Sequence, residues 1–239
     1  MNSKLKKAID TAQMAQRNYD LSKCISEQDL ETLIYAAVNS PSKQNETHYS
    51  LHVYTDQSII REIYNTTQKF TLGIKEAIER HDGEDWLYKN RSVKNSQILS
   101  NALFVYVDDE GPARGATHLA AQHNMSDEQK NTLIEQKNYS IGISIGELIL
   151  AANLLGYKTG LCSAFSVSAV KDIVDTNKTP KMLVGVGHDN IDIDRRLHAE
   201  TLNKDIPIER RTGDINEKWQ FPSFEKLVNV YVNSHKYYG

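Results

Sequence analysis

Six residues, 40–45, are the first candidate for a binding function in this chain. They read Ser-Pro-Ser-Lys-Gln-Asn, a set of hydroxyl, ammonium and amide groups that can hydrogen-bond a phosphate or the polar edge of a ring. The same residue types are common in turns, where they satisfy the local backbone. The composition of the segment is compatible with both interpretations, a ligand-binding loop and an ordinary turn.

Nucleophilic and metal-binding side chains are sparse. The two cysteines, Cys24 and Cys162, have neither C-x-x-C nor histidine spacing. Cys162 lies in an apolar run, which favours a buried thiol over a nucleophile. His118 and His123 have no third ligand at a usual spacing, so we expect no metal site. Nucleotide-binding G-x-G-x-x-G and G-x-x-x-x-G-K-[ST] motifs are also missing from the sequence, and any redox chemistry would need a cofactor.

The composition is typical of a globular domain. The chain has 239 residues, of which 39% are hydrophobic, and a net charge of -3. This length can bury a full core, and we expect residues 1–239 to form a single domain. The near-neutral charge balance argues against a broad nucleic-acid or membrane surface. Since we find neither an apolar run of about 18 residues nor a leader pattern, we expect a cytoplasmic protein.

Hydrophobic periodicity predicts the elements that would position these residues. We expect an α/β fold with a mixed central sheet flanked by helices. The strands are predicted at 49–54, 102–107, 158–163 and 182–186. The helices are predicted at 3–17, 26–38, 57–80, 138–155 and 166–174, with a last one near 224–230.

The segment 138–165 is the most apolar of the chain, and we expect the fold to be arranged around it. Its first two-thirds read as a helix that is apolar on most sides, so that little of it would face water. Gly142 and Gly146 lie one turn apart, and each costs about 1 kcal/mol relative to alanine in a helix. That cost predicts the close approach of another backbone or a flat ligand. The plainer alternative is a central helix of any α/β domain.

The last fifty or so residues, 189–239, are charged and show little core pattern. A segment of this kind needs a surface to lie on, and a partner subunit is one candidate.

Four motifs in order resemble the flavin-dependent nitroreductase family. The first joins Arg17-Asn18-Tyr19 to the segment Ala36–Asn45 and the strand 49–54. The second, Lys94–Leu99, leads into the strand 102–107. The third is the central helix with its following strand, Gly142–Phe165, and the fourth is Val184–His188 with a basic segment after it.

The resemblance implies a homodimer with an FMN at each subunit interface and a C-terminal arm that lies on the partner subunit. It also implies that NADH or NADPH passes a hydride to the flavin, which then reduces a nitroaromatic, quinone or similar acceptor in ping-pong fashion. Lys43 would place a charge near the ring, although a solvent-facing role suits a loop lysine as well. The matching cofactor-binding residues are Arg17, Ser40, Ser42, Lys43, Asn45, Asn95, Gln97, Ser163, Ala164, Arg210 and Arg211. Among them, the resemblance assigns Arg17 to the FMN phosphate, and Asn95 and Gln97 to the polar edge of the ring.

The sequence departs from the family at the phosphate-binding motif, which usually reads Arg-x-Ser-x-Arg/Lys. Gln13 and Ala15 replace two of its three groups, and only Arg17 remains. The loss of two charge-assisted hydrogen bonds, each worth roughly 1.5–3 kcal/mol, would weaken FMN binding. Arg210 and Arg211 are candidates to compensate. The alternatives are therefore a flavin-binding or flavin-sequestering protein with little turnover and a colourless relative that acts as an interaction protein.

Overall fold

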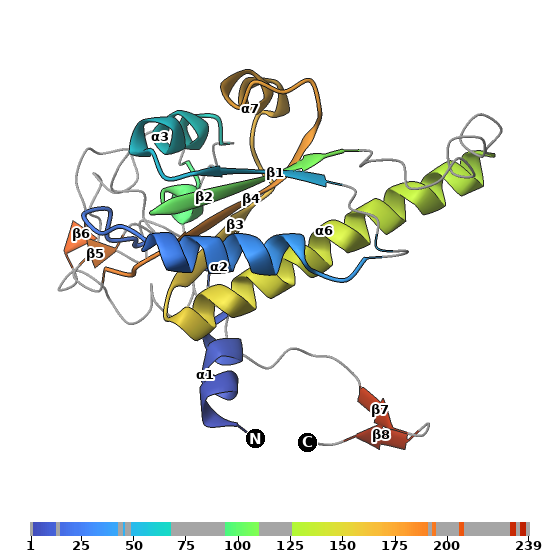
Figure 1. Cartoon of the computed structure of the whole chain (residues 1–239), viewed down its shortest axis with the longest axis horizontal. Coiled ribbons are helices and arrows are strands. Elements are labelled where there is room, and N and C mark those ends of the chain that lie inside the picture. The colour runs from blue at the N-terminus through green and yellow to red at the C-terminus, as the bar shows by residue number, and fades with distance from the viewer. Residues whose placement is uncertain are drawn as a thin grey trace, which may run out of the picture.

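The computed structural model of the chain describes residues 2–12, 15–42, 45, 49–67, 94–109, 126–190, 193–194, 206–207, 230–232 and 235–237. At its centre is a four-stranded sheet with the order β1-β2-β4-β3 (Figure 1). The strands are β1 (Tyr49–Tyr54), β2 (Ala102–Asp108), β3 (Lys158–Cys162) and β4 (Pro180–Gly187). All three pairings are antiparallel. The α/β class is confirmed. A mixed sheet was expected, but the described strands of this sheet contain no parallel pair.

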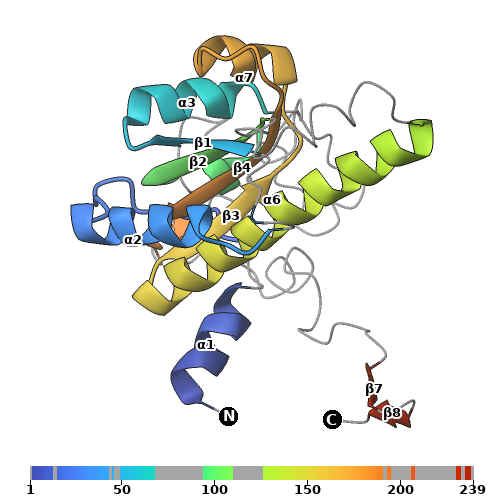
Figure 2. The ribbon, with the colours of Figure 1, turned by 45° about the vertical axis from the view of Figure 1, so that its right-hand side comes forward.

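Helices cover both faces of this sheet (Figures 1 and 2). α2 (Glu27–Val38) and α6 (Asp127–Leu155) pack on one face, and α3 (Gln57–Asn65) and α7 (Val167–Ile173) pack on the other. Alternate side chains of a strand point to opposite faces, and β2 supplies both cores in this way. Toward α2 and α6 it directs Ala102, Phe104 and Tyr106; toward α3 and α7 it directs Leu103, Val105 and Val107.

Local sequence signals set both ends of α2. The Ser26 hydroxyl accepts the backbone N–H of Asp29 at 3.1 Å, which is the N-cap interaction that the sequence predicts. The helix ends at Val38, three residues before Pro41, because proline disfavours helical geometry in the residue before it and has no N–H to donate.

α6 is longer than predicted. It begins at Asp127, eleven residues before the expected start at Asn138. Ser126 and Gln129 form a capping box there. This pattern can be recognised in the four residues 126–129 of the sequence. At the other end Gly156 adopts a φ of 95°, which confirms the predicted left-handed C-cap.

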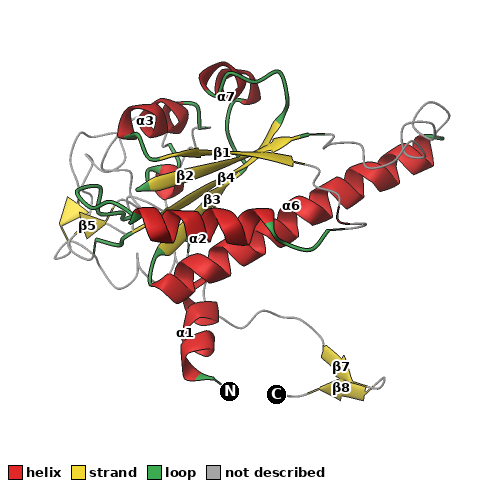
Figure 3. Ribbon diagram, viewed as in Figure 1, coloured by secondary structure: helices red, strands yellow, loops and turns green. Residues whose placement is uncertain are grey.

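Two other helices are shorter than predicted. α1 (Ser3–Ala12) ends five residues before Arg17, because the Gln16 N–H bonds the Thr159 carbonyl of β3 and not a helical partner. Apart from a single bridge at Tyr19, residues 15–26 form a loop (green in Figure 3). α3 ends at Asn65, with Thr66 as its C-cap, whereas the pattern predicts a helix to residue 80. Residues 68–80 lie outside the described part of the chain.

One face of α6 is open in the single chain, contrary to the prediction. Ile141, Ile145 and Leu148 are buried, but Tyr139 and Ile143 are 62% and 43% exposed. A Cβ placed at Gly142 or at Gly146 would meet nothing within 4 Å. The described part of the chain therefore supplies no backbone that would explain these glycines. By length and composition α6 could also cross a membrane, a property that core helices of globular proteins share.

The described parts of the tail form two short two-stranded sheets. β5 (Ile193–Asp194) pairs with β6 (Ile206–Pro207), and β7 (Val230–Val232) pairs with β8 (His235–Tyr237). Val230 thus begins a strand, at the position where the sequence predicts the end of a helix. The remainder of that predicted helix, 224–229, lies outside the described residues.

Candidate functional site

A pair of glycines in neighbouring strands forms the floor of the candidate site. Gly160 of β3 and Gly185 of β4 are partners in the sheet register, and the short 3-10 helix η3 (Ser96–Ile98) packs on them. A Cβ at Gly160 would lie 2.7 Å from the backbone oxygen of Gln97 and 2.6 Å from that of Gln16. A Cβ at Gly185 would meet the same Gln97 oxygen. Glycine is required here because two other chain segments approach the sheet at backbone distance.

Residues 15–20 are one of these two segments. The Gln16 N–H donates to the Thr159 carbonyl at 2.8 Å, and the hydroxyl of the fully buried Tyr19 donates to the Gly185 carbonyl at 3.1 Å. Burial raises the pKa of Tyr19 well above its ordinary value, so this side chain remains a neutral donor. The bonds on both sides of Arg17 therefore fix its backbone beside β3.

Gln97 of η3 connects Arg17 to β3. Its amide lies between the Leu161 carbonyl and the Arg17 guanidinium, and only one orientation of the amide lets it hydrogen-bond both. In that orientation Nε2 donates to the Leu161 oxygen and Oε1 accepts from Arg17 Nη2 at 2.6 Å. The reverse orientation would gain only a long bond of 3.4 Å from Asn95 Nδ2. Arg17 and Gln97, which the resemblance assigns separately to the phosphate and the ring, are thus direct partners.

Asn95 fixes the start of η3. Its Oδ1 accepts the Gln97 N–H at 3.1 Å, and its own N–H donates to Thr67 Oγ1 at 3.0 Å. A side-chain hydrogen bond also links Asn95 to Cys162, whose thiol pKa is raised because burial outweighs its hydrogen bonds. Cys162 is 3% exposed. The prediction of a buried thiol at this position is confirmed.

Ser163 and Ala164 continue directly from β3. Ser163 is exposed, and the Ala164 carbonyl accepts a weak hydrogen bond from Cys162 Sγ at 3.5 Å. Phe165 then forms a β-bridge with Thr67, the residue whose hydroxyl also accepts the Asn95 N–H. The structure therefore brings the backbone at 163–164 close to the turn that contains Asn95 and Gln97.

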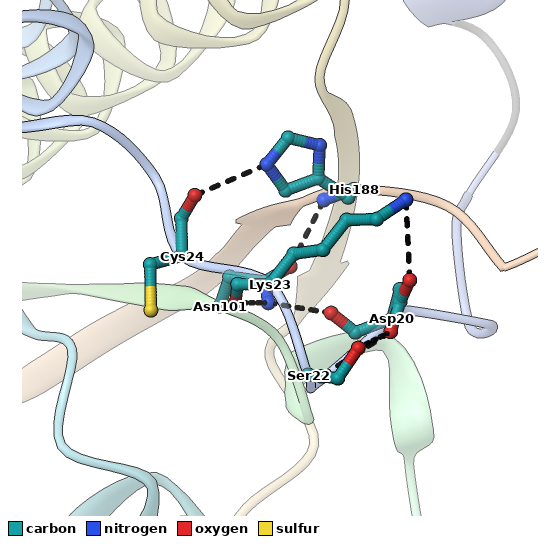
Figure 4. Close-up of polar contacts among 6 residues, drawn as sticks. All are labelled: Asp20, Ser22, Lys23, Cys24, Asn101 and His188. Atoms are coloured by element: carbon teal, nitrogen blue, oxygen red, sulfur yellow. Dashed lines mark hydrogen bonds and ion pairs between the residues drawn. The ribbon is translucent and has the colours of Figure 1, made fainter.

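A second polar cluster anchors the segment that follows Arg17 (Figure 4). Asn101 Nδ2 donates to the carbonyls of Asp20 and Lys23 at 2.8 and 2.6 Å, while its Oδ1 accepts the His188 N–H at 2.9 Å. His188 Nε2 lies 3.2 Å from the Cys24 carbonyl, and the Cys24 sulfur points away from the imidazole. Because these bonds join backbone groups of residues 20–24 to the end of β4, the cluster has a structural role.

The loop 40–45 belongs to a different polar network. Ser40 is buried, and its hydroxyl donates to the Ala37 carbonyl at 3.3 Å. The hydroxyls of Tyr49 and Ser144 donate to the same carbonyl, each at 2.6 Å. These bonds place Ser40 at the C-terminal end of α2, and none of them involves Arg17 or η3.

Other residues of this loop are described in part. Ser42 is half-buried and its carbonyl accepts the Asn45 N–H at 3.1 Å. Asn45 is exposed and has a φ of 55°, a left-handed conformation that asparagine tolerates better than most residues. The hydrogen bond between Ser42 and Asn45 is typical of a turn.

The sheet order separates this loop from the Gln97 cluster within one chain. The loop precedes β1 at one edge, whereas Ser163 follows β3 at the opposite edge. Three strand spacings of about 4.8 Å each place these edges about 14 Å apart. The single chain thus brings together Arg17, Asn95, Gln97, Ser163 and Ala164 but leaves Ser40, Ser42 and Asn45 apart from them.

Of the remaining predicted site residues, only Ala15 lies in the described part of the chain. Ala15 is exposed beside Arg17, and its carbonyl accepts an Arg17 Nη1 bond at 3.4 Å. Gln13, Lys43, Arg210, Arg211, His118 and His123 lie outside the described residues. Within the described ranges no group of three His, Cys, Asp or Glu side chains could hold a metal ion.

Residues 142–146 read Gly-Ile-Ser-Ile-Gly, the G-x-S-x-G pattern of hydrolase nucleophiles. That pattern requires a sharp turn between a strand and a helix, but here it lies in the middle of α6. Ser144 is fully buried, donates to Ala37, and lies 3.0 Å from the Tyr106 hydroxyl. It therefore joins α2 to α6 and is no nucleophile.

The family model described as Nitroreductase family matches residues 12–188. No curated protein matches the chain. Similar solved structures include a nitroreductase family protein from Clostridium novyi NT, which is 16% identical with a TM-score of 0.53 over 78% of this chain and 85% of that chain.

Two further structures are similar to the same degree. One is named a nitroreductase in complex with FMN, from Exiguobacterium sibiricum 255-15, with 13% identity, a TM-score of 0.55 and coverage of 77% and 88%. The other is named an NAD(P)H:FMN oxidoreductase, from Staphylococcus epidermidis ATCC 12228, with 14% identity, a TM-score of 0.53 and coverage of 79% and 88%. At these identities the likeness establishes a shared fold.

Proposed function

Because this chain belongs to the nitroreductase family, whose model matches residues 12–188, we propose that it is an FMN-dependent oxidoreductase. NADH or NADPH would be the electron donor, and a nitroaromatic, quinone or similar compound the acceptor. One observation carries the proposal beyond family membership. The Arg17 guanidinium, the Gln97 amide and the accessible backbone after β3 meet at one end of the sheet.

These residues fit a phosphorylated ring compound. A guanidinium has five N–H donors, so Arg17 can bond Gln97 and an anion at the same time. Asn95 and the backbone at Ser163 and Ala164 offer polar groups at the rim of the apolar cluster around Cys162 and Phe165, as expected for a site that binds a flat, mainly apolar ring. The bound flavin would supply hydride and electron transfer. The role of the chain is to bind and orient it.

We also propose that the site is completed by a second copy of the chain. The loop 40–45 and the residues 163–164 follow opposite edges of the sheet, about 14 Å apart by strand spacing, so one ring cannot lie against both in one chain. A second copy packed on the open face of α6 would cover Tyr139 and Ile143. It would also occupy the space beside Gly142 and Gly146.

The dimer is tested by a charged substitution on this face. Ile143→Glu should convert the protein from dimer to monomer in sedimentation velocity and should release FMN. Val167→Glu is the matched control, because Val167 is 41% exposed but lies on α7, across the sheet. A wild-type protein that sediments as a monomer with FMN bound would refute the shared site.

An absorbance spectrum of the purified protein tests the activity. We expect a yellow protein whose flavin absorbance is bleached by NADH or NADPH without oxygen and returns when a nitroaromatic or quinone is added. A yellow protein that neither nucleotide bleaches would indicate the flavin-sequestering alternative. A protein that stays colourless with excess FMN would refute flavin binding altogether and indicate an interaction protein.

A further inference from the structure

The Gln97 amide has an unusual position for a group expected to contact a ring. Gln97 is 8% exposed as a residue, and its side-chain carbonyl oxygen and one amide N–H are engaged by Arg17 and by the Leu161 carbonyl. Both partners belong to the protein. We propose that Gln97 is a positioning residue that orients the Arg17 guanidinium, and that it thereby makes the site select phosphorylated flavin over unphosphorylated flavin. This inference rests on the proposed function.

The backbone around Gln97 is held rigidly enough for this role. Its carbonyl packs on the glycine pair of β3 and β4, where an added Cβ could be placed only if that carbonyl moved. Its N–H is capped by Asn95 at 3.1 Å, and Asn95 is itself bonded to Thr67. An amide carried by such a turn has little freedom to follow a mobile arginine, so the amide sets the direction of the guanidinium.

The neutrality of Gln97 is part of the argument. An amide oxygen can accept a hydrogen bond from Arg17 without neutralising its positive charge. A carboxylate in the same place would form an ion pair with Arg17 and reduce its attraction for a phosphate. A contact with the ring predicts a different outcome, because the ring is common to FMN and riboflavin, whereas only FMN has the phosphate.

The experiment therefore compares FMN with riboflavin. Equilibrium dissociation constants of both would be measured by flavin fluorescence for the wild type and for Gln97→Glu. We expect Gln97→Glu to weaken FMN binding by about tenfold, the size of one charge-assisted hydrogen bond. Riboflavin affinity should change by less than about twofold, because the ring contacts remain. Retained riboflavin binding would show in the same sample that the site is folded.

Two further variants serve as a matched control and as a test of whether Gln97 acts through Arg17. Gln57→Glu is the matched control: its Nε2 also donates to a backbone carbonyl, that of Ser100, at 2.8 Å. It should leave the ratio of the two dissociation constants unchanged. Arg17→Ala tests whether Gln97 acts through Arg17. If it does, adding Gln97→Glu to Arg17→Ala should not weaken FMN binding further. Gln97→Leu, which removes the acceptor without adding charge, should shift the ratio in the same direction and replaces Gln97→Glu if that variant does not fold.

The outcomes separate this inference from the proposed function. Equal losses of FMN and riboflavin affinity in Gln97→Glu, or no loss of either, would overturn the positioning role. A wild-type protein that binds both flavins equally would overturn it as well, because no phosphate selection would exist. A wild-type protein that binds neither flavin would instead refute the proposed function.

Discussion

Gly160→Ala is a direct test of the floor of the site. The added Cβ would lie 2.6 and 2.7 Å from the backbone oxygens of Gln16 and Gln97, so each oxygen must retreat by about 0.7–0.8 Å to reach the ordinary contact distance of 3.4 Å. Both contacts are to backbone, which cannot simply rotate away. Overpacking of this kind costs about 1–3 kcal/mol. For a chain of this length a loss of about 2 kcal/mol lowers Tm by roughly 4–8 °C.

The displaced segments are those that carry Arg17 and Gln97, so Gly160→Ala should also weaken FMN binding, by at least about tenfold if one charge-assisted bond is lost. Urea unfolding and flavin fluorescence would measure the two effects. Gly156→Ala is the matched control: its φ of 95° makes the alanine strained, by about 1–2 kcal/mol, but among the described residues beyond its chain neighbours no atom lies within 4 Å of the new Cβ. It should lower stability and leave FMN affinity unchanged. A Gly160→Ala protein that binds FMN as tightly as the wild type would refute the reasoning.

Three further results are expected. Arg17→Ala should weaken FMN at least about tenfold in a fluorescence titration, and an unchanged dissociation constant would place the anchor elsewhere. A hydrogen bond from the Tyr157 hydroxyl at 2.7 Å lowers the pKa of Asp29 below its ordinary 3.8. The loss of folding stability in Tyr157→Phe should therefore be largest above pH 3.8 and should disappear as the pH falls through the pKa of Asp29 in the folded protein. A loss of stability that is constant with pH would contradict this. A chromogenic disulfide reagent should titrate Cys24 in the native protein and Cys162 only after unfolding in urea, because Cys24 is exposed whereas burial raises the pKa of the Cys162 thiol; a rapid reaction of both would contradict the buried assignment.

Local signals predicted those parts of the fold that local chemistry determines. Ser26 and Pro41 bracket α2, and Gly156 ends α6, because caps and prolines act within a few residues of where they stand. The end of α1 was mispredicted for the opposite reason. Helical periodicity continues to Arg17, but the Gln16 N–H is used by Thr159, 143 residues away, and such competition has no local signature.

The candidate site shows the same division. Family resemblance selects Arg17, Asn95 and Gln97, and the structure brings them together. The resemblance gives no indication that Gln97 would bond Arg17, since that contact depends on how η3 lies on the sheet. Glycines inside strands do predict a close backbone approach, so Gly160 and Gly185 could have been singled out. Their pairing with each other, however, depends on the register of β3 and β4.

The three hydrogen bonds of the Asn101 amide span 81, 78 and 87 residues of sequence. The bond from His188 needs β2 and β4 to have come together, since Asn101 precedes the first strand and His188 follows the second. The bonds to Asp20 and Lys23 need residues 20–23 to reach the start of β2. Contacts of such long range close late during folding. The segment from Arg17 to Cys24 should therefore be among the last to dock. A newly made chain would be able to bind an anionic ligand through Arg17 only after the sheet is assembled.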